Sequence, residues 1–195
     1  MMIFDNLIGK EIILASQSPR RQELLKGIGV EFRILVKNGI EEDFDTQMPF
    51  DEVAVFLARK KADAYSDEIR DGVILITADT IVCTENEILN KPIDKEDAIR
   101  MLKNLSGKKH KVITGVCIKS SKKESCFSAE SIVYFKELEL SEIEYYIELF
   151  KPYDKAGAYG IQEWIGYIGV TSIEGSYFNV MGFPIQKVYT ELRKF

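Results

Sequence analysis

Histidine is almost missing from this sequence, which has a single one, His110, among 195 residues. A Ser-His-Asp triad would have to pass through His110, and no G-x-S-x-G motif is present to support one. A metal site built from several histidines is excluded for the same reason. Carboxylates are therefore the natural candidates for a catalytic base.

Cysteine is also scarce, and long apolar runs are absent. Cys83, Cys117 and Cys126 form no C-x-x-C pair, and an odd number suits a reducing compartment better than a secreted scaffold. No apolar run approaches the ~20 residues that a membrane helix needs. Charged residues at positions 5, 10 and 11 interrupt the N-terminal segment where a signal peptide would be apolar. We therefore expect a cytoplasmic protein that does not contact a membrane.

Positive charge is in deficit. The chain has 26 Lys+Arg and 31 Asp+Glu, so 26 − 31 gives a net charge of −5. This balance argues against nucleic acid as a partner, because basic surface supplies most of that affinity. It does not argue against a small anion held by a few local cations. Neither a P-loop nor a G-x-G-x-x-G fingerprint occurs.

What is present is the composition of an ordinary globular protein, with 46% hydrophobic and 29% charged residues. No linker, repeat or low-complexity tract interrupts it, so residues 1–195 are expected to form one domain. Apolar runs at 11–15, 31–36 and 73–78 predict strands, and residues 111–119 and 125–135 predict two more. Helices are expected after Pro19, over 51–66 with Asp51 as cap, after Asp94, at a capping box beginning at Ser141, and after Pro184. Strands interleaved with helices indicate an α/β fold with a mixed sheet.

The segment 12–25 holds the most informative pattern. A strand is followed by Ser16 and Ser18, and the next helix starts with Pro19, Arg20 and Arg21. Helix N-termini bind phosphate through unpaired N–H groups and partial positive charge. Arginine at this place opposes the helix dipole, so two in succession suggest that an anion is expected. An ordinary Ser-Pro helix start with two solvated arginines is the alternative, and the local sequence leaves both open.

Acidic residues supply the second pattern. Asp79 lies at or near the end of the apolar strand 73–78, where active-site groups of open α/β sheets gather. The alternative is an aspartate in a tight turn that starts a hairpin. Glu41, Glu42 and Asp43 follow Gly39 in a predicted loop. Acidic loops are usually solvated surface, but beside a phosphate site they are candidate ligands for Mg²⁺.

Taken together, these segments resemble the Maf family of nucleoside triphosphate pyrophosphatases. The resemblance follows the chain in order through 16–25, 39–42, 58–62, 78–82, 90–92, 105–116, 154–162 and 175–184. It implies an elongated mixed sheet flanked by helices around a central cleft. It also implies hydrolysis of a nucleoside triphosphate to the monophosphate and pyrophosphate with a divalent metal, Mg²⁺ or Mn²⁺.

The resemblance also suggests a branch of the family. Arg20, Thr80 and Gln162 match the members that prefer dTTP and UTP, and not the branch that acts on 7-methyl-GTP. One departure is visible, because Glu163 and Trp164 follow Gln162 where the family usually continues into a glycine-rich turn.

The resemblance assigns roles residue by residue. Asp79 is the expected general base and, with Glu42, a metal ligand; Glu42 is preferred to Glu41 from its place in the family motif. Arg20, Thr80 and Gln162 are expected to read the base. The expected phosphate-binding residues are Ser16, Ser18, Arg21, Lys61, Lys91 and Lys155. A homodimer is left open, as are roles in cell-division arrest or in removing non-standard nucleotides. The alternatives are a non-catalytic nucleotide-binding or division-associated protein and a pyrophosphatase for modified nucleotides.

Overall fold

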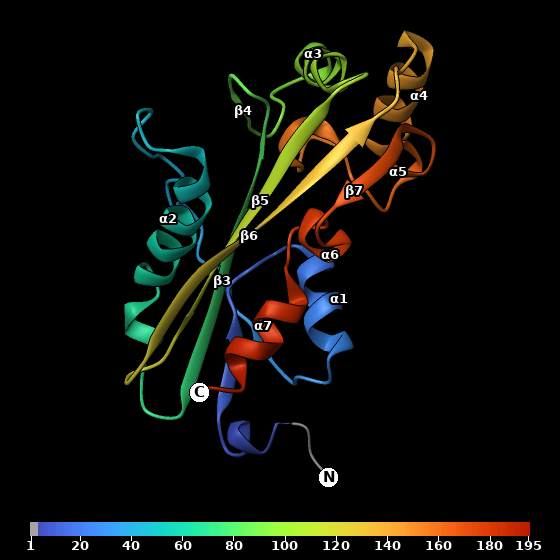
Figure 1. Ribbon diagram of the computed structural model, residues 1–195. Coiled ribbons are helices and arrows are strands. Elements are labelled where there is room, and N and C mark those ends of the chain that lie inside the picture. The colour runs from blue at the N-terminus through green and yellow to red at the C-terminus, as the bar shows by residue number, and fades with distance from the viewer. Residues whose placement is uncertain (1–3) are drawn as a thin grey trace. The chain divides into compact units, whose positions relative to one another are not determined.

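The computed structural model describes residues 4–195, and a seven-stranded mixed sheet runs through it (Figure 1). The strand order is β2-β1-β3-β5-β6-β7, and β4 pairs with β3 outside this path. The strands are β1 (Glu11–Leu14), β2 (Arg33–Ile34), β3 (Val73–Cys83), β4 (Ile88–Leu89), β5 (Lys109–Lys119), β6 (Glu124–Phe135) and β7 (Val170–Glu174). The predicted α/β class with a mixed sheet is confirmed.

Ten helical segments surround the sheet among residues 4–195. The α-helices are α1 (Pro19–Gly27), α2 (Phe50–Asp63), α3 (Lys95–Leu105), α4 (Leu140–Phe150), α5 (Trp164–Gly169), α6 (Tyr177–Val180) and α7 (Ile185–Leu192). Short 3-10 turns are η1 (Asp5–Leu7), η2 (Ser66–Glu68) and η3 (Ala156–Ala158). None of the helices in this part of the chain has both the length and the apolar character needed to cross a membrane.

The described chain divides into two compact units. The first contains the residues up to Asp79, together with Thr114–Ala129 and Gly182–Phe195, and the second contains Thr80–Ile113 and Glu130–Met181. The expectation of a single domain over 1–195 stays a prediction.

In the first unit, β1 pairs in parallel with both β2 and β3, and alternate residues of these strands face opposite layers of helix. Ile12, Leu14 and Ile76 pack in one core with α1 and α7. Ile13 and Leu75 pack in another core with α2. Figure 1 shows α2 on one side of these strands and α1 with α7 on the other. The odd-numbered positions of β3 within the first unit therefore face α2.

Gly115 explains how closely α2 packs on the sheet. A Cβ at this position of β5 would overlap the backbone carbonyl of Ala54, in the second turn of α2. Only glycine leaves room for the helix backbone to approach β5 at this distance. The helix position, and with it the position of every side chain on α2, depends on this residue.

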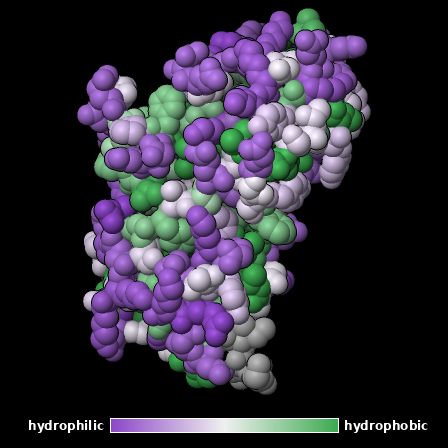
Figure 2. All heavy atoms as spheres, in the orientation of Figure 1, coloured by the Kyte–Doolittle hydropathy of each residue, from purple (hydrophilic) through white to green (hydrophobic). Residues whose placement is uncertain are grey.

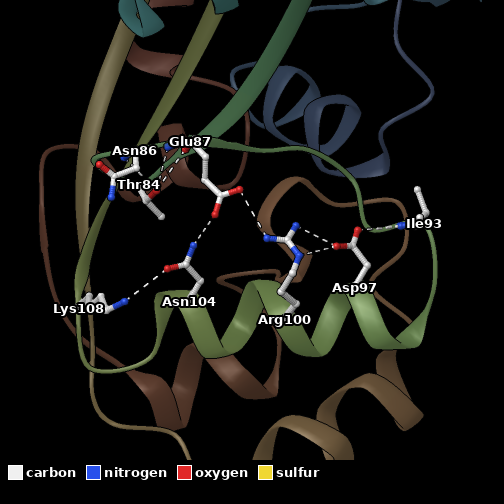
Figure 3. Close-up of polar contacts among 8 residues, drawn as sticks. All are labelled: Thr84, Asn86, Glu87, Ile93, Asp97, Arg100, Asn104 and Lys108. Atoms are coloured by element: carbon white, nitrogen blue, oxygen red, sulfur yellow. Dashed lines mark hydrogen bonds and ion pairs between the residues drawn. The ribbon is translucent and has the colours of Figure 1, made fainter.

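The second unit has one core, which draws on β3, β4, β5, β6, α3, α4 and the segment 158–165. Figure 3 shows how the turn between β3 and β4 is fastened to α3. Glu87 accepts a 2.7 Å hydrogen bond from Asn104 and lies 3.5 Å from Arg100. At the start of the helix, the side chain of Asp97 accepts a hydrogen bond from the Ile93 backbone N–H. These contacts hold both ends of the segment that carries Lys91.

Most predicted elements are present, and three details were wrong. Asp51 lies inside the first turn of α2, whose N-cap is Pro49. The capping box of α4 uses Glu139 and Glu142 instead of starting at Ser141. The strand predicted over 31–36 is reduced to the two residues Arg33 and Ile34, which pair with Ile13 and Leu14 of β1. The strand predicted over 111–119 is present as β5, which lies between β3 and β6.

The accessible face drawn in Figure 2 is mostly hydrophilic, with smaller groups of hydrophobic side chains among the polar ones. Among the large hydrophobic residues that are exposed, several belong to α4 and the turn after it: Leu140, Tyr145, Leu149, Phe150 and Tyr153. Tyr146, which also belongs to α4, is fully buried.

Candidate functional site

Asp79 lies inside β3 and not at its end, because the strand continues to Cys83. The predicted placement at a strand end or in a tight turn was therefore wrong. Its odd-numbered position directs the carboxylate to the α2 side of the sheet. Thr77, two residues before Asp79, faces the same side and donates a hydrogen bond from its hydroxyl to the carbonyl of Ala58 in α2. Asp79 is only 8% exposed. A carboxylate this buried needs a charged or hydrogen-bonding partner.

Lys61 supplies that partner from the last turn of α2. Its ammonium contacts Asp79 directly and lies 2.7 Å from Glu42 Oε1. The neighbouring Lys60 contacts Asp43 in the same way. The acidic loop is therefore held against α2 by two successive lysines. Lys61 brings the side chains of Glu42 and Asp79 to one point, although they are far apart in the sequence.

Arg21 approaches Asp79 from α1. Its Nη1 donates a 2.8 Å hydrogen bond to the carbonyl of Ala78, the residue before Asp79, and its Nε donates to Gly182 O at 2.8 Å. Burial lowers the pKa of the Arg21 guanidinium, the Asp79 and Glu42 carboxylates oppose that change, and Arg20 adds to it. Arginine side chains stay protonated in proteins, so Arg21 still carries its charge at neutral pH. Arg21 is thus a fixed cation beside the two carboxylates.

Ser16 and Ser18 form the turn between β1 and α1. Ser16 Oγ accepts a hydrogen bond from the Ser18 N–H at 3.2 Å and lies 3.5 Å from Arg21 Nη1. Ser18 is the N-cap, as predicted, but its side chain makes no capping bond. The first turn of α1 contains no acidic residue. The first N–H groups of the helix therefore have no acidic side chain in the same turn, and the Ser18 hydroxyl does not cap them.

The topology explains why these residues meet. β1 and β3 are neighbouring parallel strands, the connection after β1 passes through α1, and the connection before β3 passes through α2 on the opposite face. Open α/β sheets bind ligands at the carboxyl ends of strands where the direction of winding reverses. Ser16 follows the end of β1, and Asp79 lies beyond the last residue of β3 that pairs with β1. The group Ser16, Arg21, Glu42, Lys61 and Asp79 occupies such a point within the first unit.

The donor set fits a hard divalent cation. Glu42 and Asp79 offer carboxylate oxygens that face the same positive charge, and Mg²⁺ prefers one or two carboxylates with substrate phosphates. A second acidic and thiol group, Cys117, Glu124 and Cys126, has ligand atoms within 4.8 Å of one another. Thiolates suit soft metals and not Mg²⁺. The predicted ligands Glu42 and Asp79 stay a prediction.

The remaining predicted residues, apart from Arg20 in the first turn of α1, belong to the second unit. Lys91 lies on the exposed segment after β4, and the carbonyl of Asn90 accepts a 3.1 Å hydrogen bond from Gly157 N–H. The segments that carry Lys91 and Lys155 are therefore adjacent. Lys155 is 8% exposed, with Nζ 2.7 Å from Asp154 and 3.1 Å from Glu163. Thr80 follows Asp79 in β3.

Gln162 has an orphaned polar atom. Its Oε1 is buried and has no hydrogen-bond partner in the described part of the chain. Buried acceptors without a partner are uncommon, and each one calls for an explanation. A ligand that donates a hydrogen bond would satisfy this oxygen.

Two members of these arrangements were not anticipated. Glu163, noted only as a departure from the family pattern, accepts a hydrogen bond from Tyr146 and pairs with Lys155. The Tyr146 hydroxyl in turn accepts the Gly160 N–H at 3.0 Å. The second is the Gly182 carbonyl that holds Arg21. No sequence signal marks either of them, because both contacts depend on how the chain packs.

Comparison with known proteins agrees with this reading of the residues. The family model described as Maf-like protein matches residues 11–195. A protein of Bacteroides fragilis named dTTP/UTP pyrophosphatase is 50% identical over 97% of this chain and 98% of its own length. The protein of the same name from Porphyromonas gingivalis is 48% identical over 99% of this chain and 98% of its own.

Solved structures that are similar to this chain include a HAM1 protein from Coxiella burnetii. It covers 95% of this chain and 100% of its own, with 12% identity and a TM-score of 0.48. The family match and the two close relatives confirm the predicted family and the branch that the residues suggested. The chain belongs to the Maf-like protein family.

Proposed function

We propose that this protein is a nucleoside triphosphate pyrophosphatase that hydrolyses dTTP and UTP to the monophosphate and pyrophosphate. The names of the relatives, at about half identity over nearly the whole chain, support the reaction class. The single observation that carries the proposal is the contact of one ammonium, Lys61, with both Glu42 and Asp79 beside the guanidinium of Arg21. Carboxylates and cations arranged in this way match what a triphosphate and its counter-ion require.

Asp79 is the proposed general base. Its carboxylate takes a proton from a water molecule, whose oxygen attacks the α-phosphorus, while the bond from that phosphorus to the bridging oxygen breaks and pyrophosphate leaves. Positioning and charge stabilisation carry most of the catalysis in such transfers. Lys61 holds the Asp79 carboxylate in one orientation through their ion pair, and the buried guanidinium of Arg21 adds a second positive charge beside it.

Glu42 and Asp79 would also hold the divalent cation, Mg²⁺ or Mn²⁺, which when bound neutralises phosphate charge and orients water. Ser16, Ser18 and the start of α1 are proposed to bind phosphate oxygens, since the first N–H groups of a helix have no intrahelical partner and serine hydroxyls can donate hydrogen bonds. Lys91 and Lys155 are proposed as further phosphate contacts on the family resemblance.

Base recognition is assigned to Arg20, Thr80 and Gln162. Thymine and uracil each present an imide N–H between two carbonyl oxygens. The Oε1 of Gln162, buried and unpartnered within residues 4–195, is suited to accept that N–H. Arg20 is suited to donate to a carbonyl. A guanine or adenine does not present this donor between two acceptors.

A nucleotide panel with Mg²⁺ or Mn²⁺, assayed for pyrophosphate release, tests the proposal. Hydrolysis in heavy-oxygen water should place the label in the monophosphate, because the water oxygen attacks the α-phosphorus; label in the pyrophosphate would contradict the mechanism. No turnover of any nucleotide would favour a non-catalytic binding protein. Preference for modified nucleotides over dTTP and UTP would favour a pyrophosphatase that removes non-standard nucleotides.

Glu42→Gln and Asp43→Asn form a matched pair for the metal assignment. Each removes one carboxylate charge from the same loop, and each residue contacts one of two successive lysines. Glu42→Gln should lower kcat/KM by roughly 10²-fold and raise the metal concentration needed for half-maximal rate. Asp43→Asn should stay near the wild-type rate. Equal effects of the two substitutions would contradict the assignment of Glu42 as a metal ligand.

A further inference from the structure

Two cysteines face each other on the hairpin formed by β5 and β6. These strands are neighbours in the sheet and are joined by a tight turn closed by the hydrogen bond from Ser120 N–H to Lys123 O. Cys117 is three residues before Ser120 and Cys126 is three residues after Lys123, so the two occupy directly opposed positions. Opposed residues have Cα atoms about 4.5–5.5 Å apart, which is within the span of a disulfide.

The two thiol side chains are in direct contact. Both cysteines are reduced, and their sulfur atoms are 2.7 Å apart. Cys117 is fully buried and packs against α2 with Ala58 and Ala62, whereas Cys126 is partly exposed. One thiol is thus accessible from solvent, and the other is held against it from the protein interior.

Basic groups surround the accessible thiol. Arg59 of α2 makes a side-chain hydrogen bond to Cys126 and lies 3.0 Å from Glu124. Lys119 lies 3.0 Å from the other oxygen of Glu124. The hydrogen bond with Cys117 lowers the pKa of Cys126, as does Arg59, against the opposite effect of burial and of Glu124. The same hydrogen bond and burial raise the pKa of Cys117.

The positive charges around Cys126 favour oxidation of the thiols over metal binding at this group. Cys117, Glu124 and Cys126 could in principle ligate a soft metal ion, as their ligand atoms are mutually close. Glu124, however, already carries two cationic partners, and one of these, Arg59, also contacts Cys126. A divalent cation would be placed against both positive side chains. Stabilisation of a thiolate beside a second thiol is what the arrangement favours, and that is the pattern of a redox-active pair.

We propose that Cys117 and Cys126 form a reversible oxidation site, in which a hydroperoxide converts the dithiol to an intramolecular disulfide across the β5–β6 hairpin. The proposal does not depend on the proposed function, because it concerns a different group of residues and its test does not measure hydrolysis.

The reaction has two balanced steps. The Cys126 thiolate attacks one oxygen of the hydroperoxide; the S–O bond forms, the O–O bond breaks, and the departing oxygen takes a proton to leave as water or an alcohol. The Cys117 sulfur then attacks the Cys126 sulfenic acid; the S–S bond forms, the S–O bond breaks, and the departing hydroxyl leaves as water with the Cys117 proton. Two electrons pass from the two sulfurs to the peroxide. A small dithiol reverses the change.

Hydrogen peroxide at low molar excess, followed by intact-mass spectrometry and peptide mapping, tests the proposal on the full chain. The expected result is loss of two hydrogen atoms and a cross-link between the peptides of Cys117 and Cys126, reversed by dithiothreitol. Cys83 is the internal control, because it is a buried free thiol and burial raises its pKa to about 12. Unchanged mass, or cross-linking through Cys83, would overturn the proposal.

Variants separate the two steps. In Cys117→Ser the reaction should stop at a sulfenic acid on Cys126 that dimedone traps, and in Cys126→Ser the oxidation of Cys117 should be at least about tenfold slower than that of Cys126 in wild type. Arg59→Gln should slow the first step several-fold. If a variant fails to fold, peptide mapping of the oxidised wild type still tests whether Cys117 and Cys126 become cross-linked. Full protection of both thiols by one equivalent of Zn²⁺ would assign the group to metal binding and overturn the redox site.

Discussion

Lys61 and Asp79 form an ion pair between the last turn of α2 and the middle of β3, and both side chains are largely buried. A buried lysine and a buried aspartate each require the other, since an unpaired charge in the interior is strongly unfavourable. The same ammonium contacts the partly exposed Glu42. Lys61 therefore links a strand, a helix and a loop at the point where the catalytic carboxylates are proposed to act.

Lys61→Gln is expected to lower kcat/KM for dTTP by roughly 10²-fold or more, because it removes a fixed positive charge near the phosphates and the group that orients Asp79. Lys60→Gln is the matched control. It removes the same charge one residue earlier, where the contact is with the exposed Asp43. Steady-state kinetics of both variants measure this difference. A Lys61→Gln enzyme as active as Lys60→Gln would contradict the role proposed for Lys61.

Local patterns were sufficient for most of the elements that carry the site. The apolar run at β1, Ser18 before Pro19, and the apolar stripe of α2 each depend on neighbours in sequence, and each was predicted. The extent of β3 was not. Asp79 interrupts its apolar pattern, which suggested an end at position 78, but Lys61 of α2 supplies a charged partner for that carboxylate inside the strand.

Contacts between side chains that are far apart in the sequence also could not be predicted. The resemblance to a family placed Glu42, Lys61 and Asp79 in one site, but nothing in their spacing says that a lysine contacts both acids. The pairing of Lys155 with Glu163 was also unforeseen. Such contacts depend on how strands and helices pack, and a single sequence does not encode that in a local signal.

Glu163→Gln and Asp154→Asn test how Lys155 is held. Both carboxylates contact its ammonium, but the Glu163 side chain is 18% exposed and that of Asp154 is 62% exposed. Removing the buried partner should lower the free energy of unfolding by about 3 kcal/mol, whereas the exposed pair should contribute less than about 1 kcal/mol. Urea denaturation of the two variants measures the difference. Similar midpoints would show that Glu163 does not hold Lys155.

The buried His110 should make the protein less stable in mild acid. Burial lowers the pKa of His110 to about 4, against an ordinary value of 6.5, and its Nε2 is 2.7 Å from the Tyr159 hydroxyl. The unfolded chain therefore binds a proton between these values that the folded chain does not. Stability is unaffected above pH 6.5 and falls as the pH is lowered toward 4, by about 3 kcal/mol in total for this group.

His110→Gln isolates that contribution from the carboxylates, which also titrate in this range. Glutamine retains a polar group next to Tyr159 but has no proton to gain. The urea midpoint of the variant should therefore depend less steeply on pH between 6.5 and 4 than that of the wild type. Parallel slopes for the two proteins would show that His110 is not held neutral by the fold.

Gly115→Ala should be among the most damaging small substitutions in the first unit. The added methyl group would overlap the backbone of Ala54 and Val55, which cannot move without shifting α2. We expect a loss of about 3 kcal/mol in the free energy of unfolding, at the upper end for overpacking, and a fall in activity because Lys61 moves with the helix. Gly27→Ala is the control, since a Cβ there meets no atom within 4 Å. If both variants unfold at the same urea concentration, the close approach of α2 to β5 does not constrain the site.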